Sequence, residues 1–109
     1  MAFDEKLAAR VRILLQTESG LIERKMFGGI CFMVQGHMAI GVEKDNLMVR
    51  VGPEQYDQAL KAKHVRPMDF TGRPLKGFVY VSGEGYKTAA SLKKWIDLGV
   101  GFAKSLPRK

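Results

Sequence analysis

With 109 residues, 46% of them hydrophobic and 27% charged, the chain has the composition of one globular domain and is unlike a disordered segment. The formal net charge is +7, and the surplus lies in residues 53–109, which carry eleven Lys/Arg against five Asp/Glu, a balance that favours acidic partners including nucleic acid. One cysteine, no amino-terminal signal pattern and no long apolar run exclude a disulfide framework and a membrane span, so we expect a soluble, cytoplasmic, single domain over residues 1–109.

The first predicted element is a helix over residues 3–17. Asp4 fits the N-cap position, because its carboxylate can accept hydrogen bonds from the first free backbone amides. Apolar side chains recur at the spacing of one helical face: Leu7, Val11, Leu14 and Leu15. We predict residues 21–25 as a short connector that leads from this helix to the sheet, with no conformation assigned to it.

The chain passes from helix to sheet, on this interpretation, at Met26, Phe27, Gly28 and Gly29. Two adjacent glycines can adopt backbone angles closed to other residues. We expect an architectural role, with Phe27 anchored in the core and the glycines setting the angle of the first strand; a docking site for a partner is the alternative. A phosphate-binding loop is disfavoured, since no Lys-Ser or Lys-Thr follows and no third glycine completes a dinucleotide motif.

Three antiparallel strands are predicted next, over residues 30–34, 38–42 and 47–51. The last two alternate apolar and polar residues, and turns around Gly36 and residues 43–46 separate the three. Methionines are frequent in this region. If Met33 and Met48 share the outer sheet face, they would form an adaptable partner surface, because thioethers repack around varied shapes; core filling is the alternative.

The second half adds two helices and two strands. Pro53 suits the first position of a helix, residues 64–70 are predicted to be extended, and residues 78–81 form the last convincing strand. Thr88 is the predicted cap of the final helix, whose apolar stripe comprises Leu92, Trp95, Ile96, Gly99, Phe102, Ala103 and Leu106. The predicted fold is α+β, a two-layer sandwich with a mainly antiparallel sheet of about five strands backed by helices, in the order α-β-β-β-α-β-β-α.

No set of residues with the spacing of a catalytic or metal site is evident. His37 and His64 stand in different elements without acidic or cysteine residues at ligand spacing, and Cys31 lies in an apolar run with no cation beside it. We therefore expect a protein that is not an enzyme and that holds no cofactor or metal. A small-molecule-binding domain or enzyme is the minor alternative.

The basic residues of the second half are candidates for contact with an anion. If they form one patch, they would support direct binding of nucleic acid through phosphate neutralisation. A solvated surface is the alternative, because few aromatic residues accompany these charges for base stacking. The candidates are Arg66, Arg73, Lys76, Lys87, Lys93 and Lys94.

Several segments together follow the course of one protein family. They are Arg24-Lys25-Met26-Phe27-Gly28-Gly29, Gly36, Met38, Leu47-Met48-Val49-Arg50-Val51, Phe70, Gly72-Arg73-Pro74 and Phe78-Val79-Tyr80-Val81, followed by the tryptophan-bearing final helix. In this order they resemble the N-terminal domain of the bacterial TfoX/Sxy competence-regulator family, over nearly the whole chain.

The resemblance implies a two-layer α/β domain with a role in transcriptional regulation. Full-length competence regulators of this family act with a cyclic-AMP receptor protein at promoters of DNA-uptake genes, and they carry a second, helical domain after the N-terminal one. We expect a stand-alone N-terminal domain that binds a protein partner from the transcription machinery or one of its regulators. A homodimer and direct nucleic-acid binding remain open alternatives.

Overall fold

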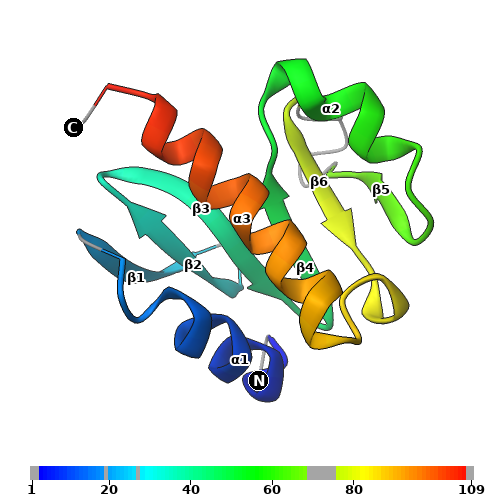
Figure 1. Ribbon diagram of the computed structural model, residues 1–109. Coiled ribbons are helices and arrows are strands. Elements are labelled where there is room, and N and C mark those ends of the chain that lie inside the picture. Colours follow the sequence, from blue (N-terminus) through cyan, green and yellow to red (C-terminus); the bar gives the residue numbers. More distant parts are fainter. Residues whose placement is uncertain (1–2, 19, 27, 69–75, 108–109) are drawn as a thin grey trace.

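The computed structural model describes residues 3–18, 20–26, 28–68 and 76–107. In this part of the chain the strands form one antiparallel sheet in the order β1-β2-β3-β4-β6-β5. The helices lie on one face of it, with α3 running across the middle strands (Figure 1). The elements are α1 (Glu5–Leu15), β1 (Leu21–Met26), β2 (Gly29–Val34), β3 (His37–Glu43), β4 (Asn46–Arg50), α2 (Pro53–Leu60), β5 (Val65–Pro67), β6 (Phe78–Val81), the short 3-10 helix η1 (Gly83–Gly85) and α3 (Ala89–Ser105).

The α+β class and the antiparallel sheet are confirmed, and the described sheet has six strands where about five were expected. The additional strand is β1, which occupies the segment at residues 21–25 for which only a connector of open conformation was predicted. This strand lacks the alternation of apolar and polar residues that marks a strand in the sequence, because three consecutive residues are charged: Glu23, Arg24 and Lys25. They are tolerated because β1 is an edge strand, where exposed charges are common.

Local signals at the helix starts act as predicted. The Asp4 carboxylate accepts hydrogen bonds from the amides of Lys6 and Leu7, and the Thr88 hydroxyl accepts one from the amide of Ser91. Pro53 opens α2, where its missing amide proton leaves no bond unmade. One residue predicted for the apolar face of α1 does not lie on it, since Leu14 is 39% exposed rather than buried.

The main core fills the space between the helices and the inner face of the sheet. Phe32 of β2 and Val49 of β4 are fully buried there, and Trp95 of α3 packs with them at 5% exposure. The Trp95 indole nitrogen donates to the carbonyl of Gly85 at 3.2 Å, so the polar atom of this large side chain is satisfied. The helix α3 approaches β3 so closely at Gly99 that a Cβ atom there would lie 2.5 Å from the carbonyl oxygen of Ala39.

A second, smaller cluster lies on the outer face of the sheet. The described helices contribute nothing to it; its buried members are Cys31, Met48, Met68 and Tyr80. Strand register aligns some of these side chains into one row that crosses all six described strands. In strand order the row is Arg24, Cys31, Gly41, Met48, Tyr80 and Arg66, with a cation at each end and an uncharged middle. No helix of the described residues is long and apolar enough to cross a membrane.

Candidate interaction surfaces

Gly28 lies in the turn between β1 and β2, and Gly29 is the first residue of β2, so the paired glycines join two strands rather than a helix and a sheet. Gly28 is exposed and has φ of 77°, in the region that favours glycine. Gly29 is buried, and a Cβ atom there would collide with the carbonyl oxygen of Val42 on β3. Phe27 lies outside the described residues, and only the backbone of Met26 is described, so the expected anchoring of Phe27 stays a prediction.

The two methionines proposed as an adaptable surface both lie on the outer face, where they occupy different rows. Met33 is half-buried and pairs with Met38 on β3 and with Ile22 on β1, whose side chain is 48% exposed. Met48 is only 5% exposed and belongs to the buried outer cluster. Among the described residues, the row Ile22, Met33 and Met38 is therefore an accessible apolar part of this face, and Met48 lies buried beside it.

Cys31 is buried beside this row, and burial raises the pKa of its thiol to about 11. At pH 8 only about one thiol in a thousand is then ionised, and the thiolate is the reactive form. We expect the native protein to react with iodoacetamide at pH 8 at least 100-fold more slowly than the protein unfolded in urea. Mass spectrometry of timed, quenched samples measures both rates, and rapid labelling of the folded protein would contradict the burial of this thiol.

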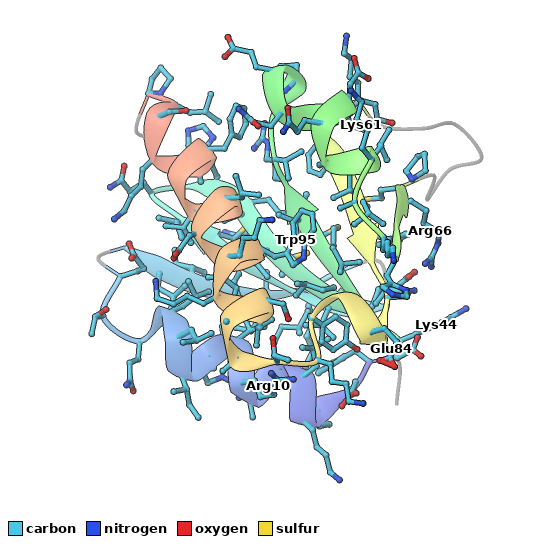
Figure 2. The ribbon with its side chains drawn as sticks, turned by 45° about the vertical axis from the view of Figure 1, so that its right-hand side comes forward. Arg10, Lys44, Lys61, Arg66, Glu84 and Trp95 are labelled. Carbon is cyan, nitrogen blue, oxygen red and sulfur yellow. The ribbon has the colours of Figure 1, made fainter. Side chains whose placement is uncertain are left out.

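The basic residues predicted to contact an anion are distributed over both sides of the sheet. Lys93 and Lys94 lie on α3, above the inner face, whereas the guanidinium of Arg66 lies 5.1 Å from the ring of Tyr80, a member of the outer cluster. Figure 2 shows Arg66 beside β5, apart from Trp95. Lys76 is exposed before β6, and Arg73 lies outside the described residues. The described members therefore do not form a single patch.

Some of these cations also have acidic neighbours. The Lys93 ammonium lies 2.8 Å from the Asp97 carboxylate, one turn along α3, and the Lys87 ammonium lies 4.0 Å from that of Glu84. Both pairs are solvent-exposed, so each adds little to stability. Their effect on a partner is to reduce the positive charge that these two lysines present.

A groove between α2 and α3 was not predicted from the sequence. Its volume is about 400 Å³, and its apolar floor includes Ala59, Trp95 and Leu98. A shallower hollow of about 560 Å³ continues along α3 and shares Lys94 and Leu98 with it. The full lining of the groove is Gln55, Gln58, Ala59, Lys61, Ala62, Lys94, Trp95 and Leu98.

Two lysines stand at this groove from opposite sides. Lys61 follows the end of α2, and the Lys94 ammonium lies 5.9 Å from the centre of the Trp95 ring, within the range of a cation–π contact. Figure 2 shows Lys61 at the end of α2 and Trp95 beside α3. The sequence does contain the apolar residues of this groove, namely Ala59 and Ala62 in and after α2 and Trp95 of α3. Only the packing of α2 against the same sheet face as α3 shows that they form one surface.

The fold and these surfaces define a small α+β domain in which helices cover one face of an antiparallel sheet. The chain belongs to the TfoX N-terminal domain family, whose model matches residues 14–103. That match confirms the resemblance seen in the sequence, and it indicates a regulatory domain related to competence regulators. No curated protein and no solved structure matches the chain.

Proposed function

We propose that this domain is a non-enzymatic regulatory module that binds a protein partner in the control of transcription. The observation that carries the proposal is the family match over residues 14–103. The partner belongs to the transcription machinery or its regulators, as the role of the family in competence implies.

Two side chains that could serve catalysis have structural roles instead, which supports the non-enzymatic part of the proposal. The Cys31 thiol is buried and, with its pKa raised to about 11, is protonated at neutral pH. His37 is also buried, and its Nε2 atom lies 2.5 Å from the carbonyl oxygen of Pro107, so this ring ties β3 to the segment after α3. Both side chains are thus buried rather than exposed at the surface.

The distribution of charge favours a protein over nucleic acid as the partner. Arg66 lies on the outer side of the sheet and Lys94 on the helical side, so these two cations do not belong to one continuous basic surface. A surface that neutralises many phosphates needs its cations together, since each contact adds to the affinity and to its salt dependence. The described cations are better suited to local contacts with acidic side chains.

Affinity capture from lysate of the source organism, with and without nuclease treatment, tests this function. We expect the tagged wild-type domain to enrich a transcription-related protein that quantitative mass spectrometry identifies, with a tagged unrelated domain of similar charge as the control. Enrichment that disappears after nuclease treatment would assign the interaction to nucleic acid. A wild-type domain that captures no protein across low and moderate salt would contradict the proposal.

A further inference from the structure

The groove between α2 and α3 combines an apolar floor with two cations that the described carboxylates do not pair. The Trp95 side chain is 5% exposed and Ala59 is 7% exposed, so the floor is formed by well-packed atoms rather than by loose side chains. Lys61 and Lys94 stand at its two sides, whereas Lys93 is paired with Asp97. An occupant of this groove would therefore meet apolar contact below and positive charge beside it.

We propose that this groove docks an acidic amphipathic helix of the protein partner. The inference rests on the proposed function and adds the surface and the chemistry of the partner. Apolar side chains on one stripe of that helix would cover Ala59, Ala62 and Leu98, and glutamate or aspartate side chains flanking the stripe would pair with Lys61 and Lys94.

The dimensions of the surface fit a helical segment. The hollows extend along α3 from Ala90 to Leu98, eight residue steps or about 12 Å, which corresponds to a little over two helical turns. Side chains spaced three and four residues apart on a docking helix cover such a distance with two or three anchors. Beyond Leu98, the exposed Gly101 has no neighbouring atom within 4 Å of the place that a Cβ atom would take, so that end of the surface is open to a close approach.

The charges identify the partner as acidic. The Lys94 ammonium lies 5.9 Å from the centre of the Trp95 ring, beside the apolar floor of the groove. A helix that covers this floor would displace water from it, so a carboxylate next to Lys94 would then interact more strongly than at an open surface. The chain as a whole carries a net charge of +7, which would attract an acidic segment and speed its association.

Two other occupants fit the groove less well. Single-stranded nucleic acid binds through bases stacked on exposed aromatic rings, and the Trp95 ring is almost fully covered by its own core. A second copy docked through the same groove would bring its own Lys61 and Lys94 toward these lysines, and the described lining of the groove holds no carboxylate to pair with them.

Fluorescence anisotropy with a labelled 16-residue peptide tests the proposal. The peptide has leucines at positions i, i+3, i+4 and i+7 and glutamate at the flanking positions; one control peptide replaces the leucines by serine and another replaces the glutamates by lysine. We expect a Kd in the micromolar range for the acidic amphipathic peptide and binding at least about tenfold weaker for both controls.

Charge-reversal variants locate the interaction. The pair Lys61→Glu with Lys94→Glu is expected to weaken peptide binding about tenfold. The matched control is Lys6→Glu with Lys25→Glu, which changes the net charge by the same amount at exposed sites away from the groove and should change the affinity less than about threefold. Equal weakening in both double variants would show diffuse charge attraction and overturn the proposal.

Chemical-shift mapping on the wild-type protein gives a measurement that does not depend on how the variants fold. Peptide-induced shifts should concentrate at residues 55–62 and 90–98, and shifts centred on Met33 and Met38 would overturn the assignment to this groove. The same variants in affinity capture separate the two proposals. Equal partner recovery by wild type and by the groove variant would reject the groove alone, whereas no recovery by wild type would reject the partner-binding function.

Discussion

Replacing Gly99 by alanine is expected to lower the free energy of unfolding by about 2 kcal/mol. The new Cβ atom would lie 2.5 Å from the carbonyl oxygen of Ala39 and 2.7 Å from the Ile40 Cδ1 atom. Both distances are too short for contact between heavy atoms, so α3 would have to move away from β3. The gain in helix propensity from glycine to alanine, about 1 kcal/mol, offsets part of this cost.

The same substitution two residues later provides the matched control. Gly101 is exposed on α3, and nothing lies within 4 Å of the position that a Cβ atom would take. Gly101→Ala should therefore raise the free energy of unfolding by about 1 kcal/mol, through helix propensity alone. Urea unfolding followed by circular dichroism measures both variants. A shift of the same sign in the two would contradict the close packing of α3 on β3.

Replacing Gly29 by alanine is expected to lower the free energy of unfolding by about 3 kcal/mol. The obstacle is steric, because the added Cβ atom would collide with the carbonyl oxygen of Val42 and lie 3.2 Å from the Glu43 Cα atom. Both are backbone atoms of β3, which is paired on both edges and cannot yield without disturbing the sheet.

At Gly28 the cost is conformational instead. Its φ of 77° is unfavourable for residues with a Cβ atom, so Gly28→Ala should cost about 1 kcal/mol, and Gly28→Asn should cost less because asparagine adopts this region more readily. Thermal unfolding of the three variants gives the order of stability, with Gly29→Ala the lowest. An unchanged melting temperature for Gly29→Ala together with lost partner capture would instead identify this turn as a docking site.

Much of the fold could be predicted because its local signals agree with one another. The caps at Asp4 and Thr88, the proline that opens α2 and the alternation in β3 and β4 each specify one element with little dependence on distant contacts. The strand β1 was missed because its central residues are charged, and their placement depends on partners elsewhere. Glu23, for example, faces the helices and accepts two hydrogen bonds from Arg12 of α1, at 2.8 and 2.9 Å.

The interaction surfaces were less predictable than the elements. Met33 and Met48 differ in exposure because they lie on different strands and pair with different neighbours across the sheet. The alternation of apolar and polar residues does not specify those neighbours. The groove depends on how α2 and α3 come together over the sheet. Lys61 and Lys94 are far apart in sequence, so the sequence alone does not show that they lie at one groove. Likewise, Arg66 and Lys94 are both basic residues of the second half, and only the topology shows that they lie on opposite sides.

In-cell photo-crosslinking is the most direct test of whether this domain binds protein. A photoreactive benzoylphenylalanine is placed singly at Ala62 beside the groove, at Ile22 on the outer sheet face and at Ile13 on the exposed side of α1, which is 62% exposed. We expect a discrete protein adduct from Ala62, weaker or absent from the other two positions. Crosslinks from all three positions to nucleic acid alone, with no protein adduct, would contradict a protein-binding regulatory module.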